Sequence, residues 1–180
     1  MSDNDQSAGG LSAGFPPIAA PNASILILGS LPGRLSLEKQ EYYGQPRNAF
    51  WRIAGEICGA GPALAYEQRI LALQQAGIAL WDVIAAAERP GSLDAAIVPS
   101  TIRINDFQSL FDRCGEIGRV FFNGRKAEAL YVRHVVPALQ PAYARLPQTV
   151  LPSTSPANAG MRPEEKLARW RAAIEPALTR

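Results

Sequence analysis

The sequence predicts an α/β protein with a three-layer αβα architecture and a central four-stranded parallel sheet. Four short apolar runs have the length of buried strands, at residues 25–28, 78–81, 120–122 and 149–151. Segments with helical periodicity separate these runs, and strands that alternate with helices form parallel sheets with helices on both faces. Polar residues, glycine or proline follow each run, as expected where buried strands end in loops.

The helices are predicted from apolar spacing and from capping signals. Phe50, Ile53, Ala54, Ile57 and Cys58 recur at i, i+3, i+4, i+7 and i+8, which is the stripe of a core-facing helix. Further helices are expected over residues 66–75, after a cap at Asn105 or Asp106, over residues 126–136, and from Pro163 onward. Residues 88–105 are expected to be mostly irregular, with a short helical turn.

A chain of 180 residues suits one domain with a sizeable core. Residues 1–22 are rich in Ser, Gly, Ala, Asp and Pro, so we expect a disordered leader followed by a single domain over residues 23–180. No apolar run approaches the roughly 18 residues of a membrane span, and the N-terminus does not resemble a signal peptide. We therefore expect a monomer in the cytoplasm, without a membrane partner, in which Cys58 and Cys114 are free thiols.

Charge is distributed unevenly along the chain. Residues 1–118 carry 8 basic and 12 acidic side chains, whereas residues 119–180 carry 10 basic and 4 acidic ones. A basic C-terminal third permits a nucleic-acid partner, although an arginine-rich solvated surface would have the same composition.

Several catalytic classes are disfavoured by what the chain lacks. His134 is the one histidine and lies within a predicted helix, which argues against Ser-His-Asp and Cys-His enzymes and against metal sites built from several histidines. The glycine-rich segment 29–33 (GSLPG) matches neither the phosphate-binding P-loop nor the G-x-G-x-x-G fingerprint. The strand-end loops instead carry hydroxyl, amide and single carboxylate groups, which suit recognition of a planar polar ring and orientation of a water molecule.

Five segments in order carry a family resemblance: GSLPG (29–33), YYGQPRNAFW (42–51), ALWDVI (79–84), FFNG (121–124) and LPSTSPANA (151–159). Together they resemble the uracil-DNA glycosylase superfamily, and within it the hypoxanthine (deoxyinosine) DNA glycosylase branch. The resemblance covers residues 23–178. It implies the three-layer fold of that superfamily and a monofunctional enzyme of base excision repair. Such an enzyme flips a deaminated base out of double-stranded DNA that contains a damaged or mismatched base, and hydrolyses the N-glycosidic bond without a metal or cofactor.

The resemblance also implies roles for individual residues. The first family motif, whose backbone lines the base pocket, corresponds to Gly29, Ser30, Leu31, Pro32 and Gly33. Leu31 stands where many relatives carry the Asp or Asn that orients the attacking water, so this catalytic role is expected at Asn48.

Three other residues are expected to contact the base. Tyr43 would stack on it, Asp82 occupies the position of a base-reading asparagine in uracil-specific relatives, and Asn123 would complete the set. The second family motif lacks the histidine that some relatives carry. DNA contacts, including a wedge into the duplex, are expected from Pro152, Ser153, Thr154, Ser155, Asn158, Met161 and Arg162.

Simpler structural roles exist for several of these residues. Asn48 precedes a helix and could only cap it, Asp82 could cap the turn after its strand, and Asn123 could only close a turn. At the level of function, hypoxanthine is the preferred substrate and uracil a second one. The alternatives are a uracil- or mismatch-specific DNA glycosylase, a non-catalytic nucleic-acid-binding module on the same fold, and a hydrolase of free nucleosides.

Overall fold

The central sheet of the computed structural model, which describes residues 10–90 and 93–178, has the strand order β3-β2-β6-β7. All neighbouring strands are parallel. The strands are β2 (Ile25–Gly29), β3 (Ile78–Asp82), β6 (Arg119–Asn123) and β7 (Gln148–Leu151). The predicted four-stranded parallel sheet is therefore confirmed, and each strand contains the apolar run that predicted it.

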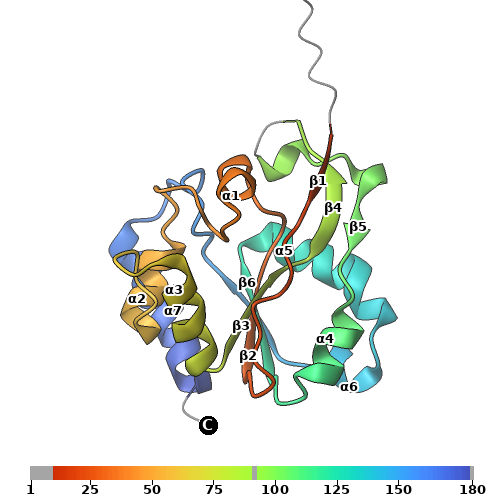
Figure 1. Cartoon of the computed structure of the whole chain (residues 1–180). Coiled ribbons are helices and arrows are strands. Elements are labelled where there is room, and N and C mark those ends of the chain that lie inside the picture. The colour runs from red at the N-terminus through yellow and green to blue at the C-terminus, as the bar shows by residue number, and fades with distance from the viewer. Residues whose placement is uncertain (1–9, 91–92, 179–180) are drawn as a thin grey trace, which may run out of the picture.

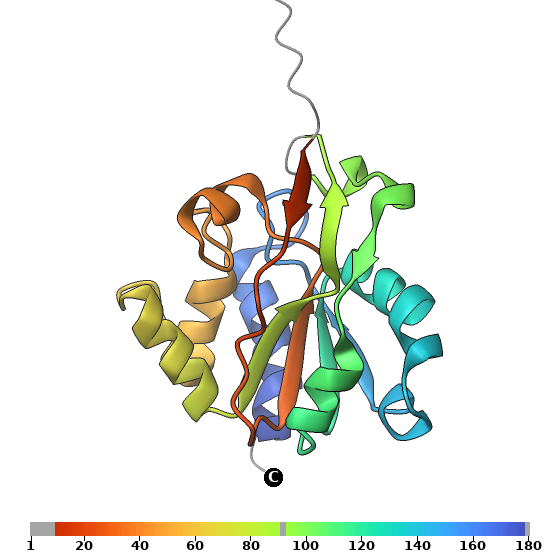
Figure 2. The same ribbon diagram turned by 45° about the vertical axis from the view of Figure 1, so that its right-hand side comes forward.

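Helices cover both faces of this sheet (Figure 1). One face carries α2 (Phe50–Cys58), α3 (Tyr66–Gln75) and α7 (Pro163–Leu178). The other carries α4 (Phe107–Arg113), α5 (Arg125–Leu130) and α6 (Pro141–Ala144). The short helix α1 (Arg34–Lys39) lies beyond the C-terminal end of β2, as both views show (Figure 2).

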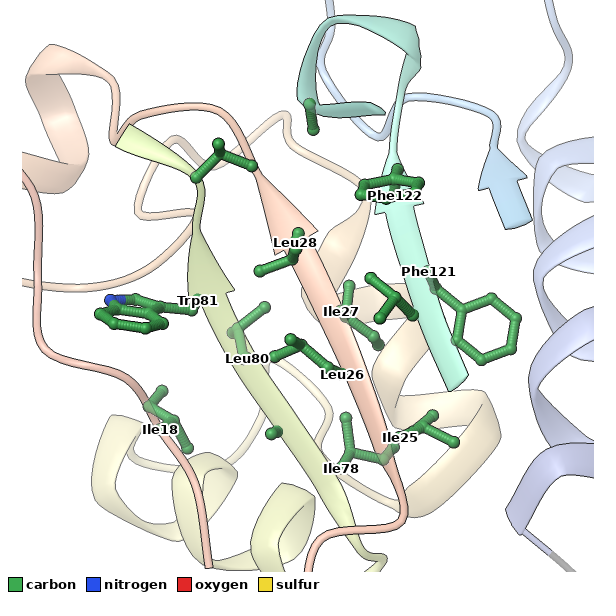
Figure 3. Close-up of a cluster of buried hydrophobic side chains, with 14 of the residues drawn as sticks. Ile18, Ile25, Leu26, Ile27, Leu28, Ile78, Leu80, Trp81, Phe121 and Phe122 are labelled. Atoms are coloured by element: carbon green, nitrogen blue, oxygen red, sulfur yellow. The ribbon is translucent and has the colours of Figure 1, made fainter. Parts of the chain in front are cut away.

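The core lies on both faces of β2, all five residues of which are buried (Figure 3). Leu28 is level with Trp81 on β3 and Phe122 on β6, and these two aromatic rings contact Phe107 and Tyr131 in the helical layer of α4 and α5. Burying each such side chain stabilises the fold by about 1.5–3 kcal/mol. A strand buried on both faces has no polar alternation, which explains its continuous apolar sequence.

A second, antiparallel sheet extends the strand ends of the first. Its order is β1-β4-β5, from β1 (Leu11–Ala13), β4 (Ile84–Glu88) and β5 (Arg103–Ile104), with one-turn helices η1 (Asp94–Ala96) and η2 (Pro99–Thr101) between β4 and β5. The chain passes from β3 into β4 through Val83 alone. The prediction that residues 88–105 are mostly irregular is thus incomplete, because strands this short acquire their pairing only from distant segments.

Residues 10–22 belong to the folded domain, which corrects the predicted boundary after residue 22. Ile18 is 7% exposed and exchanges two backbone hydrogen bonds with Leu80, the N–H of each donating to the carbonyl of the other. The Trp81 indole N–H donates to the Phe15 carbonyl, and the Tyr42 hydroxyl donates to the Pro16 carbonyl at 3.0 Å. The rest of the predicted leader, residues 1–9, lies outside the described residues.

The predicted helix over residues 126–136 is divided in the structure. After α5 the chain makes a π-helical turn, η3 (Tyr131–Val135), and then a single 3₁₀ turn, η4 (Val136–Ala138). Pro137 lacks the N–H that would continue the helix. His134 is exposed on η3, and Cys58 and Cys114 are both free thiols. Within residues 10–90 and 93–178, no helix has the length and apolar character that crossing a bilayer requires.

The inclusion of Ile18 in the core can be tested by truncating its side chain. Ile18→Ala should lower the free energy of unfolding by about 2–4 kcal/mol, because it removes buried methyl groups and leaves a cavity. Leu11→Ala is the matched control, since Leu11 is 47% exposed and its truncation should change stability by less than about 0.5 kcal/mol. Urea denaturation measures both values, and equal effects of the two substitutions would contradict this placement of residues 10–22.

Candidate functional site

The C-terminal ends of β2 and β3 bring three residues into one buried cluster, which we call the strand-end cluster: Gly29, Tyr43 and Asp82. Gly29 is level with Asp82 in the parallel register. A methyl group added to Gly29 would overlap Asp82 Oδ1 and lie 3.1 Å from the Tyr43 hydroxyl oxygen. Glycine is therefore required here, because a carboxylate and a phenol both approach its Cα.

Asp82 is buried without full satisfaction of its carboxyl group. It is 4% exposed, and its Oδ2 has no hydrogen-bond partner among the described residues. Burial raises the pKa of Asp82 to about 7, with the negative charge of Asp94 adding to the effect and Arg89 opposing it. At neutral pH a substantial fraction of Asp82 is therefore a neutral carboxylic acid, which can donate one hydrogen bond and accept another.

The Tyr43 hydroxyl is the second buried polar group of the cluster without a hydrogen bond of normal geometry among the described residues, although the Asn123 side chain lies close to it. Burial, and then the charge of Asp82, raise its pKa, whereas Asn123 lowers it by less, so the hydroxyl remains protonated. Buried polar groups are rarely left unsatisfied, and two beside one glycine indicate a place where a ligand supplies the missing hydrogen bonds. The predicted grouping of Gly29, Tyr43 and Asp82 at the strand ends is thus present in the structure.

The backbone at Tyr43 is held in an unusual conformation, with φ = 53°. Few residues other than glycine adopt this left-handed region, which costs about 1–3 kcal/mol. Neighbouring hydrogen bonds enforce it: the Trp51 indole donates to the Tyr42 carbonyl at 2.7 Å, and the Gly44 N–H donates to the Ser36 hydroxyl at 2.9 Å. Tyr42 itself is a core residue, 3% exposed.

One face of the Tyr43 ring is covered by Phe50, with ring centroids 4.1 Å apart and an interplanar angle of 24°. Phe50 also links Tyr43 to Asn48, because the Phe50 N–H donates to Asn48 Oδ1 at 3.0 Å. Asn48 therefore satisfies the first N–H of α2, although Ala49 is the N-cap residue of that helix. Its Nδ2 has no protein partner within the part of the chain that the structure describes, so the amide can still bind a further group.

The loop formed by residues 29–33 is supported from behind by two residues that the sequence did not single out. The Ser30 hydroxyl donates to Asp94 Oδ2 at 2.6 Å. Arg89, whose side chain is 1% exposed, donates to the carbonyls of Leu31 and Pro32. Two of the predicted base contacts in this loop have other surroundings. The Leu31 side chain is 6% exposed and lies in the core, and the Ser30 hydroxyl donates to Asp94.

Arg89 and Asp94 were missed because they lie in the segment predicted to be irregular. The available signal was a pair of charged residues, Glu88 and Arg89, directly after the apolar residues 84–87. An arginine in that position is buried only when carbonyl oxygens and a carboxylate surround it, and those partners come from distant parts of the chain.

Asn123 joins the ends of β6 and β7. Its Nδ2 donates to the Thr154 hydroxyl and its Oδ1 accepts from the Thr154 N–H, both at 2.8 Å, and Thr154 is 1% exposed. This pairing fits the simpler alternative, closure of the turn after β6. A contact between Asn123 and a base stays a prediction.

The loop after β7 is internally ordered by short hydrogen bonds. Ser153 Oγ accepts from the Ser155 N–H, Asn158 Nδ2 donates to the Ser153 carbonyl at 3.0 Å, and the Trp170 indole donates to the Pro152 carbonyl. The Ala49 N–H donates to the Thr154 carbonyl at 3.0 Å, so this loop is attached to the residue that follows Asn48. Met161 is half-buried and Arg162 exposed at the far end of the loop.

Comparison with known proteins gives a consistent family. The model of a family described as the uracil DNA glycosylase superfamily matches residues 16–179. Proteins named hypoxanthine DNA glycosylase from Methanosarcina barkeri and Methanosarcina acetivorans are each 44% identical over 115 residues, which is 63% of this chain and 72% of the relative. A solution NMR structure from Methanosarcina acetivorans, described as a candidate uracil DNA glycosylase, has 36% identity and a TM-score of 0.75, covering 93% of this chain and 98% of that one.

The close approach of Asp82 to Gly29 can be tested with two glycines of the same loop. Gly29→Ala should lower the free energy of unfolding by about 1–3 kcal/mol, because the added methyl group forces the Asp82 carboxylate to move. Gly33→Ala is the control, since a methyl group there meets nothing within 4 Å and should change stability by less than about 0.5 kcal/mol. Thermal unfolding followed by circular dichroism measures both, and an unchanged midpoint for Gly29→Ala would refute the geometry.

Proposed function

The chain belongs to the uracil DNA glycosylase superfamily and is a DNA glycosylase, and on that premise we propose that it excises hypoxanthine from double-stranded DNA. Two observations support this substrate. The relatives from Methanosarcina carry the name hypoxanthine DNA glycosylase at 44% identity. The observation that carries the proposal is the buried Asp82 carboxyl group, with a free oxygen at the strand ends.

Asp82 reads the base as a neutral carboxylic acid. Hypoxanthine presents an N1–H donor beside its O6 acceptor, and a carboxylic acid presents the complementary carbonyl oxygen and O–H. An ionised carboxylate would instead repel O6 and would match guanine, which presents two adjacent N–H donors. Keeping Asp82 protonated near neutral pH removes the advantage that an ionised carboxylate would give to guanine, in the way that other enzymes use buried neutral acids as donors. Guanine presents the same N1–H and O6, so its rejection falls to the space around C2, where guanine carries its amino group.

The same contact assists departure of the base. Cleavage of the N-glycosidic bond leaves negative charge on the base, part of it on O6. A hydrogen bond from the Asp82 O–H to O6 becomes stronger as this charge develops, so it stabilises the transition state more than the ground state. The protonated Tyr43 hydroxyl is a second donor in the cluster, while the ring face opposite Phe50 is the one that can stack on the base.

Asn48 positions the water that attacks the sugar. Its Oδ1 is oriented by the Phe50 N–H, and its Nδ2 can hold a water molecule by donating to it. An amide is a weak base, which suffices when the bond to the base is largely broken before water attacks and positive charge has accumulated on the sugar. Leu31, buried in the core, takes no part in this step.

Uracil is a second candidate substrate, because its N3–H and O4 form the same pair of donor and acceptor. Asp82 therefore accepts either base, and discrimination between them falls to the space around the ring. Extrusion of a base costs a few kcal/mol and is cheapest for a mispaired one, which favours deaminated bases of both kinds. We propose that the enzyme acts as a monomer.

The role of Asn48 is tested by two substitutions in an excision assay. Purified protein is incubated with duplexes that contain inosine, uracil or xanthine, and alkali then cleaves the abasic sites. We expect the wild-type protein to cleave the inosine duplex, and Asn48→Ala and Asn48→Ser to be slower by about 10²–10³-fold. Serine retains a helix cap, whereas alanine also costs about 1 kcal/mol of stability, so equal losses of activity separate catalysis from folding.

Two results of this assay would contradict the proposal. Excision at the wild-type rate by both Asn48 variants would remove Asn48 from the mechanism. Absence of scission by the wild-type protein with every duplex would favour a non-catalytic nucleic-acid-binding module on the same fold.

The protonation state of Asp82 predicts a pH profile. The rate of hypoxanthine excision should fall as pH rises above about 7, approaching tenfold per pH unit, because the fraction of neutral Asp82 falls in that proportion. Asp82→Asn keeps a donor and an acceptor but cannot ionise, so its profile should lack this fall. Asp82→Leu should be inactive at every pH. A wild-type profile that stays level to pH 9, or the same fall in Asp82→Asn, would show that Asp82 does not read the base as an acid.

The raised pKa of Asp82 also makes the stability of the fold depend on pH. The folded-state pKa of about 7 lies above the ordinary value of 3.8, so the folded protein binds the extra proton between these values. The contribution of Asp82 to stability is therefore greatest at low pH and is lost as pH rises from about 4 to about 7. Asp82→Asn should remove this part of the pH dependence of unfolding.

A further inference from the structure

A cavity of about 380 Å³ lies beside Asn48, outside the strand-end cluster. Its walls come from three segments: residues 47–56, which include the start of α2, residues 154–161 of the loop after β7, and the first turns of α7. Ala49 and Thr154, which are joined by a backbone hydrogen bond, both line it. The cavity is thus held at a fixed position relative to Asn48, the residue directly before Ala49.

A buried cation lines this cavity. Lys166 is 5% exposed, and its ammonium group donates to the Asn158 carbonyl at 3.3 Å. No carboxylate forms an ion pair with it among residues 10–90 and 93–178, and burial lowers its pKa. A buried ammonium group with one carbonyl contact retains two N–H donors, and it is expensive to bury unless an anion pairs with it.

The surroundings of Lys166 favour an anion. The 9-residue helix α2 and the 16-residue helix α7 both begin at the cavity, and helix N-termini carry partial positive charge. Arg47 and Arg52 add two exposed cations to the lining, against the exposed carboxylates of Glu56 and Glu164. The cationic side chains outnumber the anionic ones, and the most buried charge is positive.

We propose that this cavity binds one backbone phosphate of the substrate DNA, next to the extruded nucleotide, through Lys166 and Arg52. This inference rests on the proposed function, which brings a DNA strand to Asn48. The phosphate accepts from the two free N–H groups of Lys166 and from the Arg52 guanidinium, a pairing suited to phosphate oxygens. Held here, the phosphate fixes the register of the strand and thereby the position of the sugar beside Asn48.

The proposal is tested by removing the charge from each side of the contact. A duplex with a central tetrahydrofuran abasic site has no base to be cleaved, so its binding is measured independently of excision. Each flanking phosphate is replaced in turn by a neutral methylphosphonate, and dissociation constants are measured for the wild-type protein, Lys166→Met, Arg52→Gln and Arg169→Gln. Arg169 is the matched control, because it is exposed on α7, pairs with Glu165 and does not line the cavity.

We expect the affinity of the wild-type protein to fall at one flanking phosphate in particular. At that position Lys166→Met and Arg52→Gln should lose no further affinity, whereas Arg169→Gln should behave as the wild-type protein does. The slope of log K against log salt should be smaller by about 0.9 in Lys166→Met and in Arg52→Gln.

The proposal is overturned if Arg52→Gln and a folded Lys166→Met keep the wild-type salt slope and methylphosphonate profile. Arg52 is exposed, so Arg52→Gln alone decides the matter if Lys166→Met does not fold. Failure of the wild-type protein to excise hypoxanthine in the separate assay would refute the proposed substrate and leave this binding result intact.

Discussion

The arrangement of the candidate site depends on burial of the Asp82 carboxyl group against Gly29. Desolvation of a carboxylate is costly, and no donor within residues 10–90 and 93–178 satisfies Oδ2, so burial raises the pKa of Asp82 to about 7. Gly29 must lack a side chain to admit the carboxylate, and the Tyr43 hydroxyl is brought to the same point by a left-handed backbone. A protein selected only for stability would have an apolar side chain in place of this acid. Its presence at the ends of two central strands is consistent with recognition of a base that supplies the missing hydrogen bonds.

Rigid support surrounds this unsatisfied cluster. Arg89 holds the carbonyls of the loop after β2, and the pair formed by Asn123 and Thr154 joins the ends of β6 and β7. The Phe50 ring contacts Tyr43 and the Phe50 backbone N–H contacts Asn48, so the proposed base contact and the proposed water contact share one core residue. These supports hold the residues of the proposed site in place before any substrate binds. Preorganisation of this kind is what electrostatic stabilisation of a transition state requires.

Much of the fold could be predicted because its elements have strong local signals. The bounds of α3 agree with the prediction to the residue, and every predicted strand of the parallel sheet is present. The antiparallel sheet and the contribution of residues 10–22 could not be predicted. β1 and β5 have three and two residues, and such strands are stable only because β4, far along the chain, pairs with them. Ile18 was assigned to a disordered leader from the composition of residues 1–22. Composition does not reveal that a segment pairs with a distant strand, as Ile18 does with Leu80.

By itself, the sequence determined the layered fold, the order of the strand-end loops and, through its resemblance to a known family, the residues to examine. Apolar periodicity and motif order are properties of the sequence, and both can be recognised without a structure. Only the tertiary structure decided the protonation of Asp82, the pairing of Asn123 with Thr154, and the burial of Arg89 and Lys166. Each of these depends on the dielectric and on the partners that distant segments bring to one point. The pKa of Asp82 and the burial of Lys166 without a carboxylate partner among the described residues depend on the surrounding groups, and folding brings those groups together.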